Sequence, residues 1–107
     1  MRNVKTKEEK INEMAEKHFN LVWFARRSPE QVEQYPSPAR EQAMDALKEI
    51  ERKFPDDVLR ISSVDGDFWH GFNSGVLASL RLIQGLDAAT TKEEEEAEFE
   101  EFPFLDT

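Results

Sequence analysis

The sequence predicts an all-α protein: a small bundle of two long helices, one medium helix and one short helix, followed by an acidic C-terminal tail. Three observations support this fold class. Apolar residues recur at spacings of three and four over several segments of the 107-residue chain. Proline and glycine divide these segments where helices should begin or end. The one segment with strand character, residues 56–61, would have no second strand to pair with.

The first long helix is predicted to start at Thr6 and to close near Arg27. Thr6 and Glu9 have the spacing of a capping box, in which the two side chains satisfy free backbone N–H groups. Arg26 and Arg27 suit the C-terminal end because cations interact favourably with the helix dipole. Residues 19–25 are apolar almost all round, so we expect them to be covered on more than one side.

The short and medium helices share a start signal, a serine followed by a proline, at residues 28–29 and again at 37–38. The short helix must end before the prolines at 36 and 38. The medium helix should run from Pro38 to Lys53, with Pro55 beyond its end. Residues 56–61 are predicted to form a helical turn or an extended linker, and residues 62–66 a loop. The apolar stripe of the medium helix comprises Ala43, Met44, Leu47, Ile50 and Phe54.

The second long helix is predicted from Asp67 to Gln84, with Gly85 as its C-terminal stop. One face should be a large apolar ridge, and a second stripe is made of small residues and a leucine. A glycine inside a helix costs about 1 kcal/mol relative to alanine, so two glycines four residues apart indicate close approach by another helix. The approaching element is the first helix of the same chain, a second copy in a dimer, or a ligand. The ridge comprises Phe68, Trp69, Phe72, Val76, Leu80 and Ile83, and the helix-packing or dimer stripe comprises Gly71, Gly75, Ala78 and Leu82.

A third side of this helix is mostly polar and is expected to face solvent. Asp67 and His70 are three residues apart on it and can meet on the helix surface. They are either a carboxylate–imidazole dyad or an exposed histidine beside a capping aspartate, and the same question of role applies to His18. The side comprises His70, Asn73, Leu77, Arg81 and Gln84.

Residues 67–78, with the sequence Asp-Phe-Trp-His-Gly-Phe-Asn-Ser-Gly-Val-Leu-Ala and continuing to Leu82 and Ile83, resemble a segment of short uncharacterised proteins of marine cyanobacteria and their phages. The resemblance covers about 20 residues. It implies a small α-helical protein without an assigned activity, so it assigns no functional residue.

Negative charge is concentrated at the C-terminal end. Residues 1–86 hold 13 basic and 14 acidic residues, whereas residues 87–107 hold one basic and nine acidic residues. We therefore divide the chain into a helical domain, residues 1–89, and an acidic, Phe-containing tail, residues 90–107. Like charges should keep the tail mostly disordered in the absence of a partner, with a transient helix over residues 93–101 as the alternative.

The tail is the predicted partner-binding site, because aromatic anchors supply affinity and charge sets the rate of encounter. Its Glu-Glu-Phe-Pro-Phe segment is similar to the acidic tips of bacterial and phage single-stranded-DNA-binding proteins, although here Leu-Asp-Thr follows the last Phe. The alternative is that the Phe side chains fold back onto the protein's own helices or onto a second copy. The predicted site residues are Phe99, Phe102, Phe104, Leu105, Glu100 and Glu101.

The sequence lacks the motifs of several classes of enzyme and metal site. The chain has no cysteine, no Gly-Lys-Ser/Thr phosphate loop and only two histidines. Pairs of glutamates three apart occur in the first two helices, but the Glu-x-x-Asp motif of helical nucleotide pyrophosphohydrolases is missing. We therefore assign no catalytic residue, metal ligand or cofactor. A small all-α metal-dependent hydrolase using clustered carboxylates remains the alternative function.

The leading prediction is a non-enzymatic interaction or regulatory protein that acts through its acidic aromatic tail, through the small-residue face of the second long helix, or through both. Its expected partner is a protein, with a homodimer as a further option. The acidic charge disfavours direct nucleic-acid binding, and no apolar run is long enough to span a membrane. The absence of cysteine and of a secretory signal favours the cytoplasm.

Overall fold

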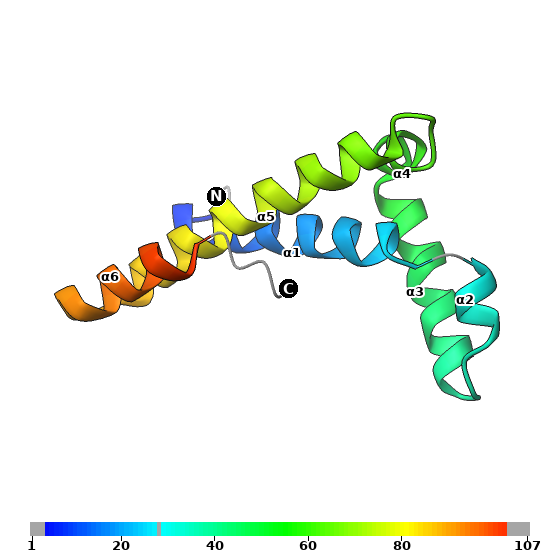
Figure 1. The fold of residues 1–107 in the computed structure, drawn as a ribbon, viewed down its shortest axis with the longest axis horizontal. Coiled ribbons are helices and arrows are strands. Elements are labelled where there is room, and N and C mark those ends of the chain that lie inside the picture. The colour runs from blue at the N-terminus through cyan, green and yellow to red at the C-terminus, as the bar shows by residue number, and fades with distance from the viewer. Residues whose placement is uncertain (1–3, 28, 103–107) are drawn as a thin grey trace. The chain divides into compact units, whose positions relative to one another are not determined.

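A computed structural model describes residues 4–27 and 29–102, and all regular secondary structure in these ranges is helical (Figure 1). This confirms the predicted all-α class. The chain divides into two compact units, residues 20–73 and residues 1–19 with 74–107. The helices are α1 (Lys7–Ala25), α2 (Pro29–Glu33), α3 (Ala39–Lys53), α4 (Pro55–Ile61), α5 (Gly66–Ala88) and α6 (Lys92–Glu101).

Local signals in the sequence position most helix ends correctly. The hydroxyl of Thr6 accepts a hydrogen bond from the Glu9 backbone N–H at 3.1 Å, as the capping box predicts, and donates one to the Glu9 carboxylate. Helix α3 spans nearly the predicted range. The ambiguous segment at 56–61 is helical, because Pro55 occupies the first turn of α4, where its missing N–H leaves no hydrogen bond unmade. Ser28, the predicted cap of α2, lies outside the described residues.

The unit of residues 20–73 has two small apolar clusters. One contains Leu21, Ile50 and Val58, and the other contains Val32, Ala43 and Leu47. Trp23 and Phe24 pack against both clusters from the C-terminal half of α1. The apolar segment of α1 is therefore covered on more than one side, as predicted. The predicted stripe of α3 is also confirmed, because its buried residues all belong to that stripe.

In the unit of residues 1–19 and 74–107, the first part of α1 lies antiparallel to the second part of α5. The Gln84 amide donates a hydrogen bond of 2.7 Å to the side chain of Asn12. A second contact involves a residue later in α1 and a residue earlier in α5: the Arg81 guanidinium lies 5.6 Å from the ring centroid of Phe19. The residue number rises from 12 to 19 along α1 while it falls from 84 to 81 along α5, so the two segments are antiparallel. The buried side chains of this unit are Ala15, Leu77, Ala78 and Leu80.

Helix α5 differs from the prediction at its C-terminal end. It continues through Gly85 to Ala88, and the Ala89 N–H bonds to the Gly85 carbonyl oxygen at 2.9 Å. The prediction that Gly85 stops the helix is wrong. A Cβ on Gly85 would collide with the Glu98 carboxylate of α6. The absence of a side chain at position 85 thus makes room for α6, and it does not end α5.

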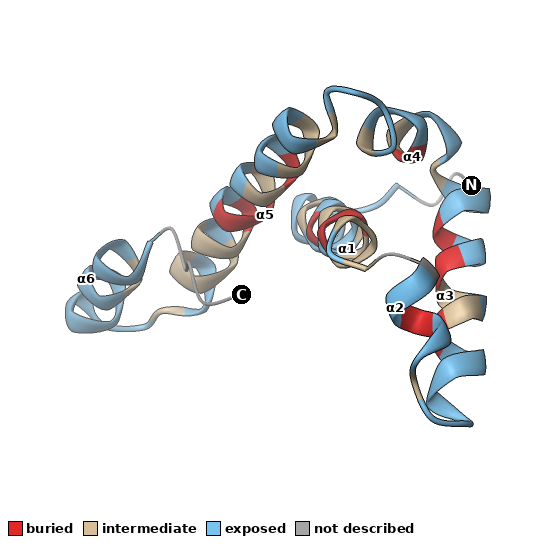
Figure 2. Ribbon diagram, turned by 45° about the vertical axis from the view of Figure 1, so that its right-hand side comes forward, coloured by how far each residue is buried: buried red, intermediate tan, exposed pale blue. Residues whose placement is uncertain are grey.

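The buried face of α5 also differs from the prediction. Asn73 and Leu77, assigned to the mostly polar side, are each only 4% exposed. Phe68 and Phe72, assigned to the core ridge, are 65% and 49% exposed, and the exposed colouring of this helix is visible in Figure 2. Of the predicted ridge, Leu80 is buried. Periodicity identified the stripes of the helix but not the stripe that the protein buries.

Candidate functional site

The predicted tail contains a regular helix, α6, and the expectation that it is mostly disordered is wrong for residues 92–101. The Thr91 side chain caps the helix by accepting a hydrogen bond from the Glu94 N–H at 3.1 Å. The Glu94 carboxylate in turn accepts a hydrogen bond of 3.0 Å from the Thr90 N–H. Acidic residues fill the first turn, where the positive end of the helix dipole stabilises them. These interactions offset the repulsion between the consecutive glutamates.

Helix α6 buries none of its residues, and most of its ribbon has the exposed colour in Figure 2. Phe99 is 60% exposed and Phe102, at the C-terminal cap, is 40% exposed. The two rings are three residues apart and so share one side of the helix. Glu100 and Glu101 are exposed beside them. The structure therefore places Phe99 and Phe102 on one side of α6 and leaves Glu100 and Glu101 exposed on its other sides, whereas Phe104 and Leu105 lie outside the described residues.

The predicted small-residue stripe of α5 is not one surface. A Cβ built on Gly71 or Gly75 would meet no heavy atom of the described chain within 4 Å. By contrast, Ala78 is buried and Leu82 is half-buried. Among the described residues, no other helix therefore packs closely against either glycine. A contact with a second copy remains a proposal for this stripe.

A cluster of aromatic side chains lies on the N-terminal turns of α5. The ring of Trp69 makes edge-to-face contacts with Phe68 and Phe72, with centroid separations of 5.2 and 5.6 Å. The Arg60 guanidinium lies 5.3 Å from the Trp69 ring centroid. Trp69 and Trp23 are both partly buried. Contact among the rings gives these side chains a fixed arrangement without a core.

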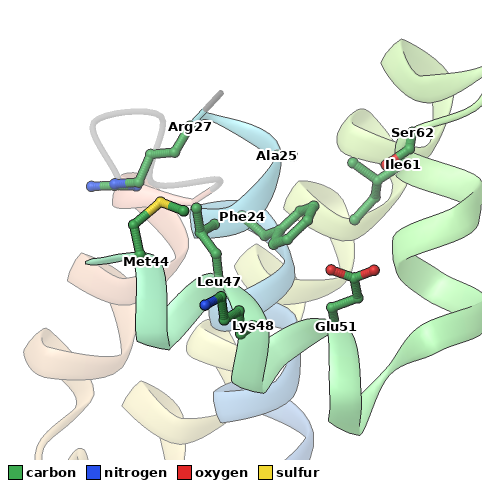
Figure 3. A pocket seen from close by; sticks show the side chains of 9 residues that line it. All are labelled: Phe24, Ala25, Arg27, Met44, Leu47, Lys48, Glu51, Ile61 and Ser62. Atoms are coloured by element: carbon green, nitrogen blue, oxygen red, sulfur yellow. The ribbon is translucent and has the colours of Figure 1, made fainter. Parts of the chain in front are cut away.

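An apolar pocket of about 450 Å³ lies in the unit of residues 20–73, between α1, α3 and α4 (Figure 3). Figure 3 shows the Phe24 ring between Leu47 and Ile61, with Met44 at one end. The polar residues at its rim are Arg27, Lys48 and Glu51.

The charged rim of this pocket is asymmetric. Arg27 lies at the same end as Met44, and Glu51 lies at the end near Ile61 (Figure 3). Arg27 donates a hydrogen bond of 3.1 Å to the Trp23 carbonyl oxygen, and its guanidinium lies 4.2 Å from the Trp23 ring centroid. These contacts hold a cation at one edge of an apolar floor.

A second, more polar pocket of about 580 Å³ borders the first, and Arg27 lines both. Its remaining lining residues are Arg26, Gln31, Gln34 and Tyr35. The sequence analysis assigned Arg26 and Arg27 to helix capping and missed both pockets. The available signal was the run Trp-Phe-Ala-Arg-Arg at 23–27, where two aromatic residues precede two cations.

Among the described residues, neither histidine belongs to a group of side chains that could hold a metal ion. The Nδ1 atom of His70 is buried and has no hydrogen-bond partner among the described residues, so Asp67 forms no dyad through that nitrogen. His18 is half-buried. Within residues 4–27 and 29–102, no three His, Asp or Glu side chains lie close enough together to hold a metal ion.

Comparison with known proteins adds no relative. The chain matches no protein-family model, and neither curated proteins nor solved structures gave a match to it. None of the helices in the described part of the chain combines the length and the apolar character needed to cross a membrane.

Proposed function

We propose that this protein is a non-enzymatic interaction protein that binds a protein partner through the acidic aromatic segment formed by α6 and the residues after it. The observation that carries this proposal is the exposure of Phe99 and Phe102 on a helix that buries no residue. Neither ring belongs to the two buried clusters of the unit of residues 20–73, and exposed aromatic side chains on a charged helix are typical of binding surfaces.

The charge of α6 defines the chemistry of the partner. Seven of its ten residues, Lys92–Glu101, are glutamates. They favour a surface rimmed by Lys and Arg, and attraction over several ångströms accelerates encounter with such a surface. The aromatic rings then supply most of the affinity by entering an apolar groove, as in recognition of a helix lying in a groove. The partner surface is therefore an apolar groove with a basic rim.

The exposed aromatic group of α5 is a second contact available to the same function. Phe68 and Phe72 are exposed to a similar extent as Phe99, but the side of α5 that carries them is almost uncharged. A partner that used this group would lack the electrostatic attraction that α6 provides. The two sets of rings therefore give a matched pair of variants for testing the proposal.

The test compares capture of proteins from a host lysate by three forms of the full-length chain. We expect Phe99→Ala with Phe102→Ala to lose a protein that the native chain retains, because the anchors are removed while the charge is unchanged. The matched variant Phe68→Ala with Phe72→Ala should retain that protein. Capture should weaken as salt is raised, because screening reduces the attraction of exposed charges.

Two outcomes would count against this function. Loss of capture only in the α5 variant would assign binding to the other aromatic group. Equal capture by all three forms, with loss only when glutamates 93–96 are changed to glutamine, would indicate attraction by charge alone.

A further inference from the structure

The apolar pocket between α1, α3 and α4 has the chemistry that the proposed function requires of a partner. Its floor is formed by Phe24, Met44, Leu47 and Ile61. Its volume of about 450 Å³ lies within the range of about 300–1,000 Å³ that is usual for ligand pockets. An aromatic ring entering it would contact an aromatic, a thioether and two branched aliphatic side chains.

The rim of the pocket supplies the complementary charge. Across the two adjoining pockets, the cations are Arg26, Arg27 and Lys48, and the one acid is Glu51. Arg27 lines both pockets, so a ligand that placed a ring in the apolar pocket could place carboxylates near the same guanidinium. The site therefore suits a short peptide in which acidic residues flank an aromatic residue.

The C-terminal segment of this chain has that composition. Residues 100–106 read Glu-Glu-Phe-Pro-Phe-Leu-Asp, with acids on both sides of two aromatic rings. In the described chain Phe102 is 40% exposed and Phe99 is 60% exposed. Both rings are therefore partly accessible to solvent.

We propose that the pocket binds the acidic, Phe-containing C-terminal segment of a second copy of the chain, an inference that rests on the proposed function and names one partner for it. The contact joins two different surfaces, the segment of one copy and the pocket of the next. Such a heterologous contact leaves a free segment and a free pocket at the ends of each assembly, so the mass should grow with concentration. A foreign partner of the segment would compete with this self-association.

The direct test uses a fluorescent peptide of residues 97–107. It is titrated into full-length chain that carries Phe102→Ala and Phe104→Ala, so that the chain's own segment does not compete. We expect saturable binding that weakens with salt. Alanine at positions 102 and 104 of the peptide should weaken binding by at least about 30-fold, as expected for loss of a central aromatic anchor.

Variants of the chain assign the binding to this pocket. Lys48→Glu should weaken peptide binding by about five- to tenfold, because an exposed rim cation becomes an acid facing an acidic ligand. Glu51→Lys should strengthen it. Lys53→Glu is the matched control, since Lys53 lies on α3 and does not line the pocket, and it should have little effect.

Sedimentation of the native chain supplies the independent readout. We expect the mean mass to rise with concentration, and the rise to be reduced by Lys48→Glu and abolished by Phe102→Ala with Phe104→Ala. Strong peptide binding together with a mass that stays monomeric at every concentration would overturn the second-copy assignment. Peptide binding that is insensitive to Lys48→Glu and Glu51→Lys would overturn the pocket assignment.

The failure of this inference can be distinguished from the failure of the proposed function. Absence of peptide binding would overturn the self-association, while capture of a lysate protein that depends on Phe99 and Phe102 would leave the proposed function intact. Loss of both results would overturn both.

Discussion

Helices α3 and α6 are both rich in charged residues, but they use their apolar side chains in opposite ways. In α3 the charges surround a narrow stripe, and Ala43, Leu47 and Ile50 on that stripe are buried. In α6 no residue is buried, although a phenylalanine is among its ten residues. Tertiary packing therefore stabilises α3, whereas α6 depends on its cap and its dipole. A charged helix can thus be part of a core or a surface prepared for another molecule.

The largest expected effect on stability comes from shortening a buried side chain of α3. Leu47→Ala should lower the free energy of unfolding by about 2–4 kcal/mol, because Leu47 is buried against Val32 and Ala43 and the variant leaves a cavity. The equivalent truncation in α6, Phe99→Ala, should change it by less than about 0.5 kcal/mol. Urea denaturation followed by circular dichroism measures both. Similar losses in the two variants would place Phe99 in a core.

Removal of the N-terminal cap of α6 should destabilise that helix without affecting the rest of the chain. Thr91→Ala removes the acceptor for the Glu94 N–H and should destabilise α6 by about 1 kcal/mol. Because α6 buries no residue, the loss should appear as lower helicity in the backbone chemical shifts of residues 92–101, with the melting temperature of the rest unchanged. A fall in the global melting temperature equal to that caused by Thr6→Ala in α1 would show that α6 is coupled to the fold.

Gly71 and Gly75 of α5 should be replaceable by alanine. Since a Cβ at Gly75 meets no atom within 4 Å, Gly75→Ala should stabilise the chain by about 0.5–1 kcal/mol through the higher helix propensity of alanine. Gly75→Leu, measured by light scattering, then tests the dimer proposal: a lower mass would indicate that a second copy packs there. Destabilisation by alanine without a change of mass would contradict the open space around this residue.

The smallest effect concerns the start of α3. The Ser37 hydroxyl donates hydrogen bonds of 2.7 Å to both Glu41 carboxylate oxygens, and these lower the pKa of Glu41 below its ordinary value of 4.5. A carboxyl whose pKa is lowered by folding adds stability above its unfolded pKa and loses it as the pH falls through the folded pKa. Ser37→Ala should therefore raise the Glu41 pKa toward 4.5 and reduce the acid sensitivity of this turn. Titration of the Glu41 carboxyl by NMR checks the shift, and an unchanged pKa would contradict it.

Local rules predicted the elements that local interactions determine. The capping box at Thr6, the stripe of α3 and the proline that begins α4 all act within a few residues, so the sequence contains the information directly. The cover over residues 19–25 was also predictable, because a segment that is apolar on all sides has no face suited to water.

Features that depend on distant residues were not predictable in this way. Gly85 has the appearance of a helix stop, but α5 continues through it, and the side-chain carboxylate of Glu98, thirteen residues later, lies beside it. Asn73 and Leu77 are buried and Phe68 and Phe72 are exposed because of which side of α5 other residues cover. Periodicity alone does not predict which side that is. The pocket is formed by three helices, so only its Trp-Phe-Ala-Arg-Arg segment was visible in the sequence.

The central claim, that the aromatic side chains of α6 serve a partner and not a core, is tested most directly by photocrosslinking. p-Benzoylphenylalanine is placed at position 99 of the full-length chain, and the matched control carries it at position 68. After irradiation in cells, the account predicts that position 99 crosslinks to a second polypeptide, either a foreign protein or another copy, in higher yield than position 68. Crosslinks from position 99 that join only residues of the same chain would contradict it.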